Sequence, residues 1–308
     1  MRVHVPVAAP MLTLDSADFG ATLPAQKSFV ASPNASGTFV YGCALNANAC
    51  IWFKQGDDKV VGELADLEQP EGIGVDPRNG DLFIADAGGS DIRVFAPNST
   101  KMLADYSDAG EAPGDVAVDS TGAFYVANIL TSTGHPGSVS VYDPSGKRVR
   151  IITDANVYVG VSVSVDEHHL VTFCFNNFQY NGECDAFKDA REPGIKLVSG
   201  WSRFTGGATV DILDHLVVAD QAARRILTFD GSTQCGLATL ERVFDPYMVA
   251  LAKYNRLMYV SDPSNGTIKE YPYFPCESGS IRRRMVYWSG LHRSGELIGV
   301  AITPEAGP

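Results

Sequence analysis

Hydrophobic residues occur in short runs along the chain, and clusters of Gly, Pro, Asn and Asp separate one run from the next. Many runs alternate apolar and polar positions, which is typical of β-strands because successive side chains of a strand point to opposite faces. No segment has the 3.6-residue period of a substantial amphipathic helix. The pattern therefore predicts an all-β protein made of many short strands.

Pairs of runs also repeat along the sequence. Three copies are clear: Pro70–Asp86 (PEGIGVDPRNGDLFIAD), Pro113–Asn128 (PGDVAVDSTGAFYVAN) and Pro246–Asp262 (PYMVALAKYNRLMYVSD). Weaker copies cover Ser28–Gly42, Val159–Phe173 and Gly206–Asp220. Six units with a period of about forty residues are thus present, a spacing typical of propeller blades.

Each unit continues with a third β-rich run after a turn, and most units with a fourth. The third runs are Ile51–Phe53, Ile92–Phe95, Val139–Tyr142, Ile195–Val198, Ile226–Phe229 and Ile268–Tyr271. The fourth runs are Val60–Leu64, Met102–Tyr106, Val149–Ile152, Ala238–Leu240 and Met285–Trp288. Four strands per unit predict four-stranded antiparallel blades, and six such units predict a six-bladed β-propeller.

The C-terminal run suggests how the ring closes. Ile298–Pro304 (IGVAITP) matches the first run of a unit, but no second run follows it. We therefore expect it to lie beside the N-terminal blade as an innermost strand. Ser28–Pro33 competes for that position, and if both were inner strands, residues 1–27 would help to build a seventh blade, which is the alternative. We predict six blades, an N-terminal extension over residues 1–27 and a single propeller domain over residues 28–308.

The clear copies, each followed by a turn and IRVF or VSVY, resemble NHL repeats. They are also similar to the wider group of six-bladed propellers that contains gluconolactonase-like hydrolases and, more distantly, streptogramin lyases. The resemblance extends from Ser28 to Pro304. It implies the propeller fold, but this group includes enzymes as well as binding scaffolds, so it does not select a function.

Composition narrows the class of partner. Of the 308 residues, 45% are hydrophobic and 19% are charged, as expected for a folded core rather than a disordered chain or a coiled coil. The net charge of −12 argues against nucleic acid and anionic membranes as partners. No run reaches the ~18 apolar residues of a membrane helix, and Met1–Pro10 lacks the apolar stretch of a signal peptide. We expect no membrane insertion, and any export signal to have been removed or never present.

Six cysteines can be paired within the predicted blades. Cys43 and Cys50 flank the turn LNANA between the second and third strands of the first blade, and Cys174 and Cys184 flank the equivalent turn of the fourth. Cys235 and Cys276 fall in predicted loops between third and fourth strands of blades five and six. These three pairs predict disulfides and a secreted or periplasmic location. The alternative is six reduced, buried thiols, and a structural zinc site is not expected because there is no CxxC pair.

The innermost strands determine what lines the central channel. One alternating set is apolar throughout and should pack between blades: Ile73/Val75, Val116/Val118, Val163/Val165, Ala208/Val210, Val249/Leu251 and Val300/Ile302. The other set is small, as a crowded axis requires, and contains one charged residue, Asp115: Gly72/Gly74, Asp115/Ala117, Ser162/Ser164, Gly207/Thr209, Met248/Ala250 and Gly299/Ala301.

A metal site at the channel mouth would use Glu71, Asp115 and Asn128. The resemblance to gluconolactonase-like enzymes implies a Glu at the opening of an inner strand, which Glu71 matches, and Asn or Asp ligands on other blades. This chain instead has Ser162, Gly207 and Met248 at those positions. A calcium or other divalent ion would want six to eight oxygen ligands, so we expect no cofactor. In the alternative role, Asn128, Asp220 and Asp262 cap the turns that follow their strands.

The remaining candidates lie in loops. His135, in Asn128–Gly137, is a candidate general base near Asp115, and the alternative is a solvated loop histidine. The other histidines are scattered, and His168, His169 and His215 fall on the opposite face of the ring.

Phe175–Pro193 reads as a long insertion tethered by Cys174–Cys184 beside the channel mouth. Its aromatic residues are candidate ligand contacts, and the alternative is that they pack the loop onto its own blade: Phe175, Phe178, Tyr180 and Phe187. We therefore favour an extracytoplasmic, non-catalytic propeller that binds a small molecule, glycan or protein on this rim. The alternatives are a metal-dependent hydrolase or lactonase, or a lyase that uses His135.

Overall fold

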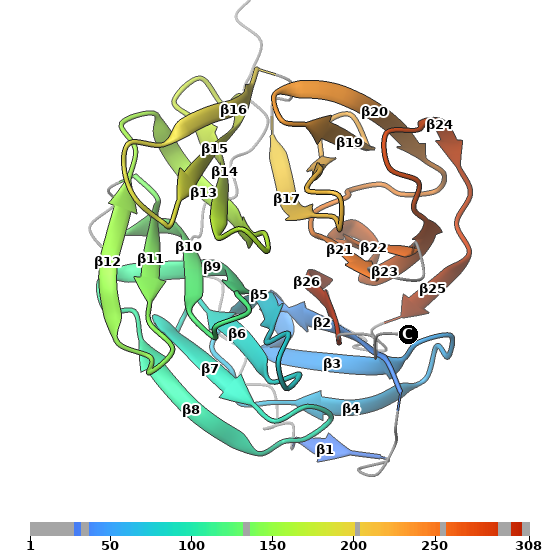
Figure 1. Ribbon diagram of the computed structural model, residues 1–308. Coiled ribbons are helices and arrows are strands. Elements are labelled where there is room, and N and C mark those ends of the chain that lie inside the picture. The colour runs from blue at the N-terminus through green and yellow to red at the C-terminus, as the bar shows by residue number, and fades with distance from the viewer. Residues whose placement is uncertain are drawn as a thin grey trace, which may run out of the picture.

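Six sheets surround a central axis in the computed structural model, which describes residues 28–31, 37–131, 136–200, 204–252, 257–288 and 297–303 (Figure 1). Within these ranges the helical elements are two short 3-10 turns, η1 (Leu45–Ala47) and η2 (Pro263–Asn265). The prediction of an all-β, six-bladed propeller with antiparallel blades is confirmed, and the seven-bladed alternative is wrong.

Each blade contains four antiparallel strands, which succeed one another from the axis outward. Blade 1 has β26 (Leu297–Ile302), β2 (Phe39–Ala44), β3 (Ala49–Lys54) and β4 (Val60–Leu64). Blade 2 has β5 (Pro70–Val75), β6 (Leu82–Asp86), β7 (Asp91–Phe95) and β8 (Met102–Ser107). Blade 3 has β9 (Glu111–Val118), β10 (Phe124–Thr131), β11 (Ser138–Tyr142) and β12 (Arg148–Thr153).

The second half of the ring follows the same plan. Blade 4 has β13 (Val157–Val165), β14 (Leu170–Asn177), β15 (Gly182–Lys188) and β16 (Ile195–Ser199). Blade 5 has β17 (Thr205–Val210), β18 (Leu216–Asp220), β19 (Arg225–Asp230) and β20 (Thr233–Leu240). Blade 6 has β21 (Val249–Ala252), β22 (Leu257–Asp262), β23 (Thr267–Pro272) and β25 (Met285–Trp288).

Two blades carry a fifth strand on their outer edge. In blade 1 it is β1 (Phe29–Val30), which pairs with β4. In blade 5 it is β24 (Ser278–Ile281), which crosses over from blade 6 and pairs in parallel with β20. β1 and β24 therefore replace β4 and β20 as the outer edges of these two blades.

The C-terminal strand closes the ring, as predicted. β26 is the innermost strand of blade 1 and pairs with β2 from Val40↔Ile302 to Ala44↔Leu297. The backbone N–H of Phe39 donates to Thr303 Oγ1 at 2.8 Å, so the two ends of the ring are hydrogen-bonded. The expectation that Ser28–Pro33 competes for this inner position is wrong, because β1 occupies the outer edge of the same blade.

Inner strands of neighbouring blades approach each other closely. A Cβ at Gly74 would lie 2.5 Å from Val116 O, and one at Gly299 would lie 2.1 Å from Glu71 O. Both separations are shorter than real Cβ contacts allow, so no side chain fits between these strands. Gly74 and Gly299, two of the small inner residues predicted from the sequence, are thus required by the approach of the backbones.

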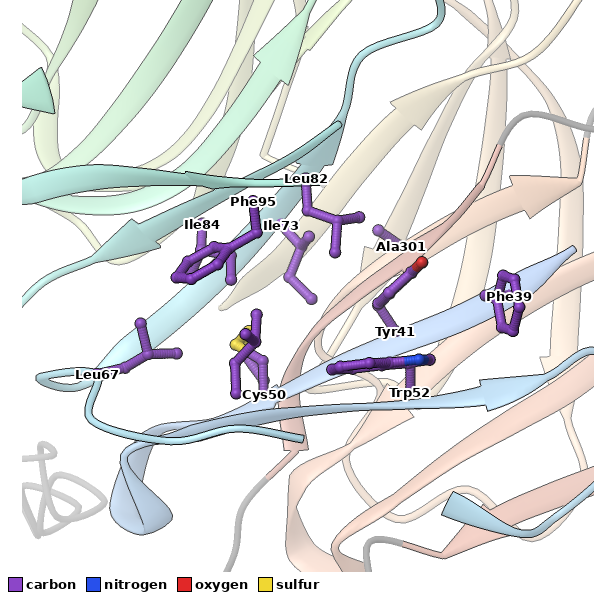
Figure 2. Packing of buried hydrophobic residues seen from close by; sticks show 12 residues of the cluster. Phe39, Tyr41, Cys50, Trp52, Leu67, Ile73, Leu82, Ile84, Phe95 and Ala301 are labelled. Carbon is purple, nitrogen blue, oxygen red and sulfur yellow. A yellow bond between two sulfur atoms is a disulfide. The ribbon is translucent and has the colours of Figure 1, made fainter. Parts of the chain in front are cut away.

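Hydrophobic side chains pack between blades, with one cluster at each of the six junctions. Figure 2 shows the cluster between blades 1 and 2, where Tyr41 and Trp52 of blade 1 face Ile84 and Phe95 of blade 2. Trp52 is fully buried and its Nε1 donates to Asn98 Oδ1 at 2.8 Å. Each blade therefore depends on both of its neighbours for a complete core.

All six cysteines are paired, in the three predicted disulfides: Cys43–Cys50, Cys174–Cys184 and Cys235–Cys276. The first two pairs occupy directly opposite positions of adjacent strands. Cys235 lies in β20 and not in a loop as expected, whereas Cys276 lies in the segment that precedes β24. Three disulfides are typical of an oxidising, extracellular environment. None of the helices in the described ranges is long and apolar enough to span a membrane.

Candidate functional site

The two faces of the ring carry different connections. The face that we call the rim face carries the turns between second and third strands and the connections from blade to blade. The opposite face carries the turns between first and second strands and between third and fourth strands. Because each blade follows the same path, candidate residues can be assigned to a face from their position in the unit.

A cavity of about 500 Å³ follows the axis and is lined by the inner strands of all six blades. Most of its lining residues are Val, Ala and Ile, and it extends to Pro77, Ser120 and Glu167 on the opposite face. Asp115 is the carboxylate that the inner strands contribute to this lining. The channel is therefore a cavity of mixed polar and apolar lining with two buried acids, Asp115 on an inner strand and Asp119 just after the same strand.

Glu71 and Asp115 lie on adjacent inner strands and are 8% and 9% exposed. Asp115 Oδ2 accepts a hydrogen bond from the backbone N–H of Val163 at 3.2 Å. Burial raises the pKa of Asp115 to about 8, and burial together with the neighbouring charge of Asp115 raises the pKa of Glu71 to about 8. The pair therefore retains protons near neutral pH, where exposed carboxyl groups are ionised.

The side chain of the third predicted metal ligand, Asn128, is hydrogen-bonded within its own blade. Its Nδ2 donates to Ser138 Oγ and Ser140 Oγ, each at 3.0 Å, so the amide is held against β11 of its own blade. In the described part of the chain, no third His, Cys, Asp or Glu joins Glu71 and Asp115 in a group of potential ligands. Two protonated carboxyl groups do not match the six to eight oxygen ligands of a hard cation.

The prediction that strand-end residues cap the turns after their strands is confirmed for Asp220 and wrong for Asp262 and Asn128. Asp220 Oδ1 accepts from the backbone N–H of Ala223 at 3.2 Å. Asp262 accepts from the backbone N–H groups of Phe244 and Asp245, at 3.1 and 3.0 Å. Asp220 thus organises a rim-face turn within blade 5, and Asp262 organises the connection from blade 5 to blade 6.

Asp115 gives a testable pH dependence. Its folded-state pKa of about 8 lies above its ordinary value of 3.8, so the folded protein binds the extra proton and stability falls as pH rises through this window. Asp115→Asn keeps an oxygen acceptor for Val163 but cannot ionise. From about pH 5 to pH 9, the free energy of unfolding of wild type should fall by at least ~1.4 kcal/mol more than that of Asp115→Asn. This difference is the equivalent of one pKa unit. Urea unfolding at several pH values measures this, and parallel pH profiles would contradict it.

His135 lies outside the described residues. His169 and His215 lie on the opposite face, as expected, but each is paired with an aspartate. His169 Nδ1 is 3.2 Å from Asp119 Oδ2 of the neighbouring blade, and His215 Nδ1 is 3.0 Å from Asp211 Oδ2. The sequence did not predict the pair of Asp119 and His169, because these residues come from different blades. The spacing of four residues between Asp211 and His215 was the signal that could have revealed the other.

Both aspartates are well stabilised as anions. Burial alone would raise their pKa values, but hydrogen bonds outweigh it and lower the pKa of Asp119 and of Asp211. Tyr273 OH donates to Asp211 Oδ2 at 2.8 Å, and Tyr125 OH donates to Asp119 Oδ2 at 3.0 Å. Each histidine therefore faces a fixed negative charge.

The prediction that Phe175–Pro193 is an insertion is wrong, because it contains the end of β14, the turn of residues 178–181 and β15, the third strand of blade 4. The run Ile195–Val198, predicted as the third strand, therefore belongs to the fourth strand, β16. Phe175 and Phe187 are 0% and 1% exposed and belong to the core between blades 3 and 4. Phe178 and Tyr180 are 52% and 39% exposed on the turn itself. Two of the four proposed contact residues are thus exposed on the rim face, and two pack the hairpin onto its blade.

Two residues that sequence reasoning missed complete an aromatic cluster. Tyr158, at the start of β13, lies 5.5 Å from Phe178 and 5.4 Å from Tyr180 between ring centroids. Phe204, 42% exposed just before β17, lies 6.1 Å from Tyr180. We call Tyr158, Phe178, Tyr180 and Phe204 the rim aromatic cluster. Contiguous exposed rings of this kind mark interaction surfaces more often than isolated ones do.

No protein-family model and no curated protein matches the sequence. Among solved structures, a chain of a nidogen/laminin complex is similar, with a TM-score of 0.70 and 14% identity over 87% of this chain and 98% of that one. Virginiamycin B lyase from Staphylococcus aureus gives a TM-score of 0.58 and 11% identity over 89% and 91% of the two chains. A protein of unknown function from Bacteroides caccae gives a TM-score of 0.62 and 11% identity over 88% of this chain and 100% of that one. These likenesses show a shared propeller fold among proteins of varied function.

Proposed function

We propose that this protein is a non-catalytic, extracytoplasmic propeller, secreted or periplasmic, that binds another protein through the rim aromatic cluster. The observation that carries the proposal is the contact between four aromatic rings, three of which are well exposed. Tyrosine and other aromatic residues dominate the energetically important positions of protein interfaces.

The scaffold beneath the cluster is rigid. Cys174–Cys184 joins opposite positions of β14 and β15, and Phe175 is fully buried next to it. The turn that carries Phe178 and Tyr180 is therefore held in place before binding, which reduces the entropy lost on association. A small molecule usually needs an enclosing cavity, and the axial cavity is lined by other residues. This favours a macromolecule over a small molecule as the ligand.

Two further observations support the proposal. Three disulfides favour an oxidising compartment and hence secretion or export to a periplasm. A propeller of similar fold occurs in a nidogen/laminin complex, which is an analogy at the level of fold and favours a protein ligand over a glycan.

The double variant Phe178→Ala/Tyr180→Ala tests the proposal. Loss of two central aromatic contacts should cost about 2 kcal/mol of binding free energy or more, which weakens Kd at least ~30-fold. Proteins captured by the wild-type chain from an extracytoplasmic fraction would be purified, and Kd would be measured for wild type and variant by surface plasmon resonance.

Phe274→Ala is the matched control, because Phe274 is 41% exposed and lies outside the cluster. It should leave Kd unchanged. A purified partner that binds the double variant as tightly as wild type would contradict the proposal. So would an oligosaccharide or a small molecule that binds the cluster while no protein does.

A catalytic channel is the second candidate, either a metal-dependent hydrolase or lactonase or a lyase. The observation that favours it is the buried Glu71–Asp115 pair, since carboxyl groups with raised pKa values occur frequently at active sites. Stoichiometric calcium or zinc that survives dialysis of wild type and is lost in Asp115→Asn would favour a hydrolase. Turnover of a cyclic ester that is lost in His135→Ala would favour a lyase.

A further inference from the structure

The three disulfides differ in exposure. The four cysteines of Cys43–Cys50 and Cys174–Cys184 are at most 2% exposed. Cys235 and Cys276 are both partly exposed, on the opposite face of blade 5. A dissolved thiol therefore reaches Cys235–Cys276 in the native protein, whereas the other two disulfides are enclosed by the core.

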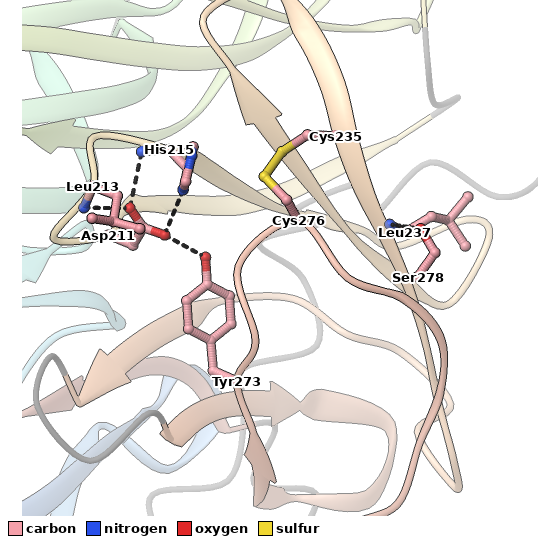
Figure 3. The surroundings of a disulfide bond; sticks show 8 residues. All are labelled: Asp211, Leu213, His215, Cys235, Leu237, Tyr273, Cys276 and Ser278. Carbon is pink, nitrogen blue, oxygen red and sulfur yellow. Dashed lines mark hydrogen bonds and ion pairs between the residues drawn. A yellow bond between two sulfur atoms is a disulfide. The ribbon is translucent and has the colours of Figure 1, made fainter.

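His215 lies beside this accessible disulfide. Its ring offers a nitrogen that lies with the sulfurs of Cys235 and Cys276 in a group whose atoms are all within 4.8 Å of one another. Figure 3 shows the three side chains together, where the turn between β17 and β18 meets β20 and the segment leading to β24. No other group of three or more such potential ligands occurs within the described ranges.

Asp211 orients the histidine. Its Oδ2 lies 3.0 Å from His215 Nδ1 and accepts from Tyr273 OH at 2.8 Å (Figure 3). Its Oδ1 accepts from the backbone N–H groups of Leu213 and His215, at 2.8 and 2.9 Å. With Nδ1 donating to the carboxylate, Nε2 is left as the nitrogen that can bind a metal. A carboxylate behind a ligating histidine is the usual support of a zinc ligand.

We propose that Cys235, Cys276 and His215 form a site for zinc or a similar metal ion, which can bind the ion only after the Cys235–Cys276 disulfide is reduced. Thiolate sulfur and imidazole nitrogen are the ligands that zinc prefers, and three protein ligands with a fourth position for water are a common arrangement. The partial exposure of all three side chains leaves room for that water.

The redox step uses a dithiol as reductant. One thiolate of the dithiol attacks a cysteine sulfur, the S–S bond breaks, and a mixed disulfide forms with release of the other cysteine as a thiolate. The second thiol of the reductant then closes its own disulfide. Two electrons and two protons have passed to the protein, which now has two cysteine thiols, and zinc binding displaces those two protons.

The geometry allows a tetrahedral ion. Zn–S bonds of ~2.3 Å place two sulfurs ~3.8 Å apart in a tetrahedron, which is farther apart than the disulfide now holds them but inside the 4.8 Å within which all three ligand atoms lie. Reduction lets the two sulfurs separate by rotation of their side chains. The metal would then replace the disulfide as the link between β20 and the segment that leads to β24.

The test compares oxidised and reduced full-length protein. The chain is treated with dithiothreitol under native conditions and desalted without oxygen. Free thiols are counted with Ellman's reagent, and Zn²⁺ binding is measured by isothermal titration calorimetry. We expect two thiols and one bound Zn²⁺ per reduced chain, and no Zn²⁺ bound at this site in the oxidised chain. Thiolate-to-cobalt absorption with Co²⁺ provides a spectroscopic check of sulfur ligation.

Matched histidine variants identify the third ligand. His215→Asn should weaken Zn²⁺ affinity of the reduced chain at least tenfold. His169→Asn should leave it unchanged, because His169 is also paired with an aspartate but has no cysteine beside it. Thermal unfolding of both oxidised variants checks that they are folded. Thiols that appear only on unfolding, a reduced wild type that binds no Zn²⁺, or equal effects of the two variants would overturn the proposal.

Discussion

A chain that ends at residue 296 is expected not to fold into the propeller. This truncation removes β26, whose Leu297 is fully buried and whose Val300 is 6% exposed between blades 1 and 6. It also removes the backbone pairing of β2 and uncovers the inner edge of blade 1. Burial of each large aliphatic side chain contributes about 1.5–3 kcal/mol, and whole proteins are stable by only about 5–15 kcal/mol. Loss of the strand therefore removes most of the stability of the ring.

Near-UV circular dichroism and thermal unfolding measure this loss. A chain that ends at Thr303 is the control, because it keeps β26 and the hydrogen bonds between Thr303 and Phe39. We expect the control to show a cooperative transition like that of the full chain. A cooperative transition of similar Tm in the shorter chain would show that β26 is not needed for closure.

Replacement of Asp262 by Ala is expected to cost about 3–5 kcal/mol of unfolding free energy, as found when one partner of a buried ion pair is removed. Asp262 is fully buried and pairs with Lys269, whose side chain is 3% exposed. The change leaves the ammonium group of Lys269 with the backbone carbonyl of Arg242 as its remaining hydrogen-bond acceptor. It also removes the acceptor of the Phe244 and Asp245 backbone N–H groups.

Urea unfolding of single and double variants separates these contributions. Asp262→Ala/Lys269→Met should be more stable than Asp262→Ala, because the double variant no longer buries an unpaired charge. The control is Arg282→Ala, which breaks the exposed pair with Glu241 and should change stability by about 0.5 kcal/mol or less. A double variant that is no more stable than Asp262→Ala would mean that the turn contacts, and not the charge pair, account for the cost.

The blade architecture could be predicted because it is encoded within each repeat. Strand order, blade number and two of the three cysteine pairs depend on neighbouring runs of one unit, as in Cys43 and Cys50 on adjacent strands. The closing role of β26 could be predicted for the same reason, since a first run without a second needs a partner. The edge strands β1 and β24 could not be, because a free outer edge can accept any short segment and the pairing of Phe29 with Glu63 follows no repeat.

The candidate sites were less predictable because several of their residues meet across blades. Phe204 lies at the start of blade 5, and its contact with the hairpin turn of blade 4 depends on how the two blades are rotated about the axis. Tyr158 contacts the same turn from within blade 4. Asp119 and His169 come from neighbouring units. Asn128 was predicted near the axis from its place at a strand end, but a register shift in β10 accompanies its turn toward Ser138.

The sharing of every hydrophobic cluster by two blades restricts how this molecule can change during evolution. Removal or duplication of a unit would disturb two junctions at once and alter the curvature of the whole circle. We therefore expect the number of repeats to stay constant. Loops on either surface touch few of these junctions and are free to diverge. New binding specificities should therefore arise at the rim aromatic cluster or around His215, while the interior of the circle stays as it is.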